Sequence, residues 1–143
     1  MNNPAQTPFE IFGEAGIREL TNAFYDIMDE LPEAAGIRAM HADNLSPMKE
    51  KLADYLIGWM GGPPLYADKH GTVCMTEPHE PYHIGPEERD QWLLCMDRAL
   101  ARTNASEELV DMLKVPMFRI ADAVRNREGP SAADTDPNVI AAG

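Results

Sequence analysis

Residues 61–96 read GGPPLYADKHGTVCMTEPHEPYHIGPEERDQWLLCM, and this stretch decides how the rest of the chain is interpreted. At its centre, His79 stands between Pro78 and Pro81. Each proline lacks a backbone donor and crowds the turn before it, so the pair excludes a long helix at this point. We therefore expect His79 on at most one helical turn, shortly before a helix that carries Trp92.

The remaining sequence predicts further helices and no strands. Apolar residues recur at helical spacing over residues 15–30. Thr7 and Pro8 have the cap-plus-proline pattern of a helix start, and Gly13 breaks the short helix 8–12 that follows. Ser46 and Pro47 have the same pattern, so Ser46 is the expected cap of the next long helix. Helices are expected at residues 8–12, 15–30 and 34–40, from Ser46 to the GGPP motif at 61–64, after Gly85, and from Asn104 or Ser106 to about Arg125. The predicted fold class is therefore all-α.

A long connection, residues 61–85, joins two of these helices and contains four glycines and four prolines. A connection of this length with little regular structure is unusual in a compact domain and often carries function. Residues 8–126 are expected to form the single folded domain. Residues 1–7 are expected to be a flexible N-terminus, and the small, polar residues 127–143 a disordered tail.

The charge balance argues against nucleic acid as a partner. The chain has 24 acidic and 12 basic residues, for a formal net charge of −12 at pH 7, and no basic run. Binding to nucleic acid or to an anionic membrane needs a basic patch. No apolar run is long enough for a membrane span, and the first residues lack the pattern of a secretory leader. We therefore expect a cytoplasmic protein in which Cys74 and Cys95 are reduced.

The four histidines do not have the spacing of a zinc or di-iron site. A zinc site needs three or four ligands at short spacings, and a di-iron bundle needs paired ExxH motifs. His79 and His83 are four residues apart, but Pro81 excludes a helical pair. Haem needs less, because one axial histidine, a flat apolar slot and groups that hold the propionates suffice. His79 on a short turn beside apolar helices is the expected iron ligand, and His83 is the alternative.

Several motifs, taken in their order along residues 9–100, resemble those of group II truncated haemoglobins, a class of bacterial and plant globins. They are FGEAGIREL at 12–20, Phe24–Tyr25, GGP after the third helix, Tyr66 with Gly71 five residues later, His79-x-Pro81-x-x-Ile84, and Arg89-Asp90-x-Trp92-Leu93-x-Cys95-Met96. The resemblance implies that residues 8–126 form a truncated globin domain. It also implies a two-over-two helical sandwich around haem b, with the iron ligand on a very short helix.

The resemblance assigns roles to individual residues as well. It makes His79 the iron ligand and Tyr25 a donor that hydrogen-bonds the dioxygen ligand. It places Trp92 and His41 on the same, distal side, with Met40 in place of His41 if the alignment contains a one-residue gap. Three such donors, each worth roughly 1.5–3 kcal/mol, would slow the release of dioxygen. The other residues expected to contact the haem or its ligand are Phe24, Met48, Lys51, Leu52, Tyr66, Ile84 and Met96.

The chain departs from this group close to His79. Relatives usually have arginines just before this histidine and a phenylalanine three residues after it. Here the preceding residues are Met75-Thr76-Glu77-Pro78, and Tyr82 replaces the phenylalanine. Because those arginines commonly help to hold the propionates, other basic groups are expected to compensate. The candidates are Lys51, Lys69 and His70.

Three functions are compatible with these residues. The first is reversible binding of dioxygen or another diatomic ligand, for storage, delivery or sensing. The second is a haem enzyme acting on nitric oxide, peroxide or sulfide, which would need an external reductase because no flavin or nicotinamide domain is evident. The third is a haem-free helical interaction protein. The sequence favours the first, in a monomer or a homodimer.

Overall fold

A computed structural model describes residues 7–71, 79 and 82–126 of the chain. Within these residues the regular structure is entirely helical, as the sequence predicts. The helices are α1 (Pro8–Glu30), the 3₁₀ turn η1 (Pro32–Ala34), α2 (Ala35–Arg38), α3 (Ser46–Trp59), α4 (Leu65–His70), α6 (Pro86–Arg102) and α7 (Glu107–Ala123). None of them combines the length and the apolar character needed to cross a membrane.

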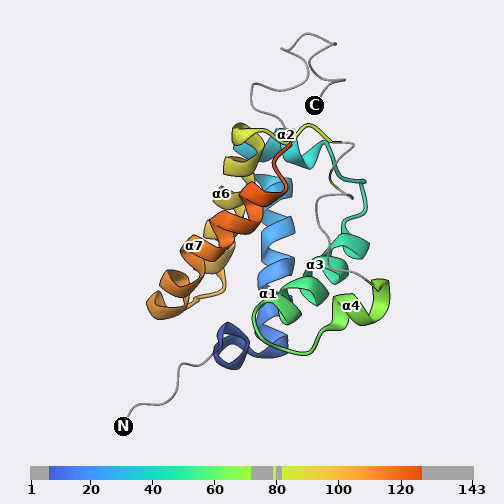
Figure 1. Ribbon diagram of the computed structural model, residues 1–143. Coiled ribbons are helices and arrows are strands. Elements are labelled where there is room, and N and C mark those ends of the chain that lie inside the picture. Colours follow the sequence, from blue (N-terminus) through green and yellow to red (C-terminus); the bar gives the residue numbers. More distant parts are fainter. Residues whose placement is uncertain (1–6, 72–78, 80–81, 127–143) are drawn as a thin grey trace.

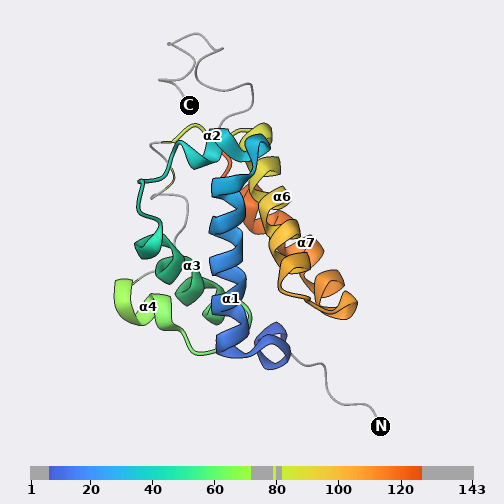
Figure 2. The same cartoon turned by 180° about the vertical axis from the view of Figure 1, so that it is seen from behind.

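Helix α1 lies at the centre of the molecule. In Figures 1 and 2 it runs between α3 and α4 on one side and α6 and α7 on the other. It packs against both α3 and α6, and α6 packs in turn against α7. Ile17, Leu20 and Phe24 are completely buried there. The four long helices therefore form two facing pairs, which is the predicted two-over-two sandwich.

The start of α1 follows the predicted pattern. Thr7 Oγ1 accepts a hydrogen bond from the Glu10 N–H at 3.1 Å, and Glu10 Oε1 accepts one from the Thr7 N–H at 2.8 Å. This reciprocal pair satisfies two donors that a helix start leaves unpaired. Gly13 has φ 75° and ψ 163°, outside the helical region and in a conformation that favours glycine. Helix α1 thus contains the two predicted helices, joined at a kink.

The region around α3 differs from the prediction in two details. Ser46 is the first residue of α3 and not its cap, since Leu45 occupies the cap position. The Ser46 N–H donates a hydrogen bond to Asn44 Oδ1 at 3.1 Å. The connection 61–85 also has more regular structure than predicted, since α4 forms within it. Helix α4 starts after Pro64 and ends at Gly71, whose φ of 79° is left-handed.

The starts of α6 and α7 agree with the prediction. The Gly85 N–H donates to Glu88 Oε1 at 2.9 Å, and Glu88 stands in the acidic first turn of α6. At α7, the Ser106 hydroxyl accepts a hydrogen bond from the Leu109 N–H at 3.1 Å. Of the two predicted caps for this helix, Ser106 is therefore the one used, because its backbone is extended and its side chain faces the helix start.

Some predictions fall on residues that the structure does not describe. They are the flexibility of residues 1–6, the proline-bounded turn at Pro78 and Pro81, the replaced residues 75–78, the state of Cys74, and the disorder of 127–143. These stay predictions.

A buried carboxylate ties three helices together. Asp54 of α3 has an exposed side-chain fraction of only 1%. Its Oδ1 lies 3.2 Å from a guanidinium nitrogen of Arg18 on α1, and its Oδ2 lies 2.7 Å from Lys69 Nζ on α4. Burial alone would raise the pKa of Asp54, but the hydrogen bonds from Lys69 and Arg18 outweigh it, so the pKa is lowered. The ionised form is therefore the stable one in the folded protein.

The lowered pKa of Asp54 predicts a loss of stability in acid. A group whose pKa is depressed on folding stabilises the protein above its unfolded pKa, here 3.8, and this contribution disappears as the pH falls through the folded value. We expect Asp54→Asn to lower the free energy of unfolding at pH 7 by about 1–2 kcal/mol. We also expect a weaker pH dependence than wild type below about pH 4.

Urea unfolding from pH 7 to pH 2 measures both effects. Asp26→Asn is the matched control, because Asp26 pairs with Lys49 but its side chain is 53% exposed. Exposed ion pairs contribute about 0–1 kcal/mol, so this variant should unfold nearly as wild type does. Equal curves for wild type and Asp54→Asn would contradict the assignment.

Candidate functional site

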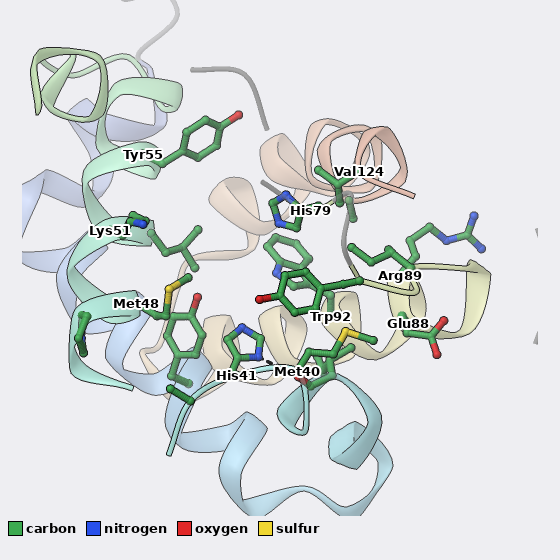
Figure 3. A pocket seen from close by; sticks show the side chains of 18 of the residues that line it. Met40, His41, Met48, Lys51, Tyr55, His79, Glu88, Arg89, Trp92 and Val124 are labelled. Carbon is green, nitrogen blue, oxygen red and sulfur yellow. Dashed lines mark hydrogen bonds between the residues drawn. The ribbon is translucent and has the colours of Figure 1, made fainter. Parts of the chain in front are cut away.

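A cavity of about 540 Å³ lies between the two helix pairs (Figure 3). Helices α1, α2, α3, α4, α6 and α7 all contribute to its walls, as does the connection around His79. The lining residues are Tyr25, Ile37, Met40, His41, Ala42, Asn44, Pro47, Met48, Lys51, Leu52, Tyr55, Tyr66, His79, Tyr82, Ile84, Glu88, Arg89, Trp92, Ala121 and Val124. Most of these contribute carbon surface, and a few polar groups converge on the same space.

Two of the four histidines, His79 and His41, line this cavity. Figure 3 shows both imidazoles and the Trp92 ring directed into the same space. His83 is not among the lining residues. Its side chain is buried, with Nε2 3.9 Å from Oε1 of Glu88, and neither ring nitrogen has a hydrogen-bond partner within the described part of the chain. The fold therefore separates the two candidate ligands that the sequence leaves open.

The loop that carries His41 is held by Arg38. The Arg38 guanidinium donates to the carbonyl oxygen of Ala42 at 3.1 Å and to that of Asp43 at 3.2 Å. Its Nε bonds Asp29 Oδ1 at 2.8 Å, which fixes the guanidinium against α1. These bonds satisfy loop carbonyls that no helix would pair. They set the position from which His41 enters the cavity.

The His41 ring is itself fixed by a hydrogen bond to the backbone. Its Nδ1 lies 2.8 Å from the carbonyl oxygen of Ile37. A carbonyl oxygen can only accept, so Nδ1 carries the hydrogen, and Nε2 of the neutral ring has a free lone pair. Burial is the main cause that lowers the pKa of His41; the hydrogen bond to Ile37 opposes it, and the charge of Arg38 acts in the same direction as burial. The neutral ring is therefore favoured.

Four aromatic rings follow one another at the base of the cavity. Phe24 lies edge-on to Tyr25, with ring centroids 4.9 Å apart, and tilted against Trp92 at 5.2 Å. The Tyr25 ring is in turn edge-on to His41 at 5.7 Å. Such contacts are favourable and directional. Phe24, which is completely buried, thus sets the positions of the phenol and the indole that reach the cavity.

The phenol of Tyr25 is available as a donor. Burial raises its pKa well above the ordinary value for tyrosine, because the phenolate would lose its hydration. The hydroxyl therefore keeps its proton over the whole physiological range. Together with the indole N–H of Trp92, it gives the cavity two neutral hydrogen-bond donors.

The basic groups expected to hold the propionates differ in their surroundings. Lys51 lines the cavity and its side chain is exposed at the rim. Lys69 does not line it, because its ammonium pairs with Asp54 and, at 3.4 Å, with Glu50. His70 is also outside the lining, and its ring is tilted against that of Tyr66, with the ring centroids 4.5 Å apart. Of the three candidates, only Lys51 faces the site.

The fold brings together most of the residues that the sequence singles out. Besides Lys69, His70 and His83, two further residues do not line the cavity: Phe24 and Met96 are buried in the core. The cavity also includes residues that the sequence does not single out for the site, among them Tyr55, Glu88, Arg89, Ala121 and Val124. Ala121 and Val124 belong to the end of α7, and their apolar spacing indicates a buried face without showing what it covers.

The family model of the bacterial-like globins matches residues 7–126, which is most of the chain. The chain belongs to the bacterial-like globins. A curated group 2 truncated haemoglobin, YjbI of Bacillus subtilis, is 28% identical over 113 residues, or 79% of this chain and 83% of that protein.

Solved globin structures place the protein in the same class. The group II 2-on-2 haemoglobin of Agrobacterium tumefaciens is 43% identical, with a TM-score of 0.82 over 90% of this chain and 100% of that one. The cold-adapted truncated haemoglobin of Pseudoalteromonas haloplanktis TAC125 is 35% identical, with a TM-score of 0.82 over 86% and 100%. The resemblance to group II truncated haemoglobins is thus confirmed, and membership implies haem-based binding of small ligands in general.

The residues of this globin fit the haem that the family implies. The cavity volume is within the range of about 300–1,000 Å³ typical of cofactor sites. The imidazoles of His79 and His41 both reach into it, and apolar residues such as Leu52 and Ile84 line its walls. The Tyr25 phenol and the Trp92 indole also line the cavity, and Lys51 stands at its rim. The cavity thus combines imidazole nitrogens, an apolar slot and a cation, which are the kinds of group that haem binding needs.

Proposed function

We propose that this globin binds dioxygen or another diatomic ligand reversibly at haem b, with His79 as the axial ligand. The observation that carries the proposal is the convergence of His79, Tyr25, His41 and Trp92 on one cavity. The separation of His83 from that cavity supports His79 over its rival. When bound, the haem supplies a ferrous iron that holds the diatomic ligand and transfers negative charge to it.

Tyr25 and Trp92 would stabilise a ligand that carries partial negative charge. The phenol O–H and the indole N–H are both donors, and each keeps its proton at neutral pH. Donors that are already in place act without reorganisation, and the apolar surroundings strengthen them. Phe24 maintains this arrangement through its contacts with both rings.

The contacts of His41 favour a different role from the one that the sequence suggests. The resemblance makes it a third donor to the ligand, but its N–H is committed to the carbonyl oxygen of Ile37. The neutral ring then presents a lone pair on Nε2, which accepts a hydrogen bond. We infer that His41 acts as an acceptor in the distal pocket, so that two strong donors face the ligand and not three.

Absorption spectra of the ferric, ferrous and carbonyl forms test the proposed function. The expected result is a Soret band in the purified protein and a five-coordinate ferrous form that binds carbon monoxide and dioxygen. A protein that shows no Soret band after reconstitution with haem would be a haem-free helical protein, and the proposal would be wrong.

Lys51 gives a testable prediction for propionate binding. Of the three cations that the sequence singles out for the propionates, it alone lines the cavity, and the other lining cation, Arg89, pairs with Asp90 and Asp122, so we expect Lys51→Met to weaken haem binding. Because Lys51 is exposed at the rim, the effect should be about two- to fivefold in the rate of haem release, as for other exposed ion pairs. Transfer of haem to an excess of apomyoglobin measures this rate.

Lys114→Met is the matched control for that experiment. Lys114 lies exposed on α7 and does not line the cavity. Its replacement removes the same charge from the protein, so it should leave haem release unchanged. Equal rates for the two variants would show that Lys51 does not hold a propionate.

A further inference from the structure

Asn126, just beyond the end of α7, links that end to the segment containing His79. Its side-chain Nδ2 donates to the carbonyl oxygen of His79 at 3.0 Å. Its Oδ1 accepts a hydrogen bond from the Ile84 N–H at 3.0 Å. Its own backbone N–H donates to the carbonyl oxygen of Ile84 at 2.7 Å. One residue thus makes three hydrogen bonds to the short segment that carries the candidate iron ligand.

The orientation of the Asn126 amide follows from its partners. The His79 carbonyl oxygen can only accept and the Ile84 N–H can only donate, so each end of the amide has one partner that suits it. Turning the amide over would place oxygen against oxygen and nitrogen against nitrogen. The two contacts therefore define a single side-chain position.

These bonds connect the segment to a distant part of the chain. The carbonyl oxygen of His79 also accepts the Tyr82 N–H at 3.0 Å, which closes a single turn. A turn of this length has little stability alone. Asn126 adds a contact from 47 residues along the chain and joins the turn to α7. Val124, two residues before Asn126, lines the same cavity as His79. The end of α7 therefore contributes to the cavity wall and also contacts the backbone of His79.

We propose that Asn126 is a positioning residue for His79, fixing the height and direction from which the imidazole enters the cavity. The inference rests on the proposed role of His79 as the iron ligand. Asn126 does not line the cavity, so it acts through the backbone of His79. Groups that orient a metal ligand typically change metal affinity by about 10–100-fold when they are removed.

The experiment compares two variants of the haem-loaded full chain. Asn126→Ala removes both side-chain contacts. Asn126→Asp keeps an oxygen that can accept from the Ile84 N–H but replaces the donor to the His79 carbonyl oxygen with a second acceptor. Asn22→Ala, on the exposed face of α1, is the control. The readouts are the iron–histidine stretching band of the ferrous protein in resonance Raman spectra and the rate of haem transfer to apomyoglobin.

We expect both Asn126 variants to shift or broaden the iron–histidine band and to release haem about tenfold faster, at the low end of the range for groups that orient metal ligands. The control should match wild type in both readouts. Circular dichroism checks that each variant is helical, and if Asn126→Ala does not fold, Asn126→Asp carries the comparison.

The other outcomes overturn the inference in different ways. If both variants keep the wild-type band and release rate, Asn126 does not position His79, while the proposed function stands. If Asn126→Asp behaves as wild type, the bond to Ile84 suffices and the bond to His79 has no effect. If wild type itself lacks the band, His79 is not the ligand, and the proposed function fails along with the inference.

Discussion

Replacing His79 by alanine is expected to abolish the five-coordinate ferrous form of this globin. His79 lines the cavity together with His41 and Trp92, whereas His83 does not line it and has its Nε2 3.9 Å from Oε1 of Glu88. Loss of a group that only orients a metal ligand weakens binding by about 10–100-fold. Because this variant loses the ligand itself, the rate of haem release should increase by more than that. Ferrous absorption spectra and haem transfer to apomyoglobin measure the two effects.

Chemical rescue distinguishes loss of the ligand from loss of the fold. His79→Gly leaves space at the same position, so added imidazole should restore the five-coordinate ferrous spectrum. His70→Ala is the control, since His70 is exposed and does not line the cavity. If His79→Ala keeps the wild-type spectrum and His83→Ala loses it, the assignment of the two histidines is reversed.

Replacing Tyr25 by phenylalanine is expected to speed the release of dioxygen by about 10–150-fold. This range corresponds to one hydrogen bond of about 1.5–3 kcal/mol to a group that carries charge. The change removes only the hydroxyl, so the ring contacts with Phe24 and His41 can persist. Stopped-flow displacement of dioxygen by carbon monoxide measures the rate.

Tyr55→Phe is the matched control for Tyr25→Phe. Tyr55 also lines the cavity, but Figure 3 shows its hydroxyl pointing away from His41 and Trp92. We expect it to change the release rate less than threefold, roughly half a kcal/mol. If Tyr25→Phe releases dioxygen at the wild-type rate, then Tyr25 does not donate to the ligand, and Trp92 alone would have to account for any stabilisation.

The helices could be predicted well from the sequence, because their starts and ends depend on neighbouring residues. Thr7, Gly13 and Ser106 act through bonds or backbone angles within about one turn of themselves. The cap of α3 was assigned wrongly for a related reason. The side chain of Asn44, two residues earlier, accepts a hydrogen bond from the Ser46 N–H. From the sequence alone, the side chain of either Asn44 or Ser46 could accept hydrogen bonds from the N–H groups at the helix start.

Site residues were predicted less completely, since lining a cavity depends on the packing of several helices. Phe24 is adjacent to Tyr25 in sequence, yet one ring supports the wall and the other reaches the cavity. Lys69 has the right charge to bind a propionate, but its ammonium forms an ion pair with the buried Asp54. The sequence shows the charge and type of each residue, but it does not show which other residue each side chain contacts.

The sequence by itself determined the helical class, the resemblance to group II truncated haemoglobins, and the prominence of His79, because these depend on local spacing and on motif order. Only the tertiary structure decided that His79 and not His83 enters the cavity and that His41 gives its N–H to Ile37. It alone brought Asn126 to the backbone of His79. Such contacts join segments up to 47 residues apart, and only the packing of α1, α6 and α7 determines which of them meet.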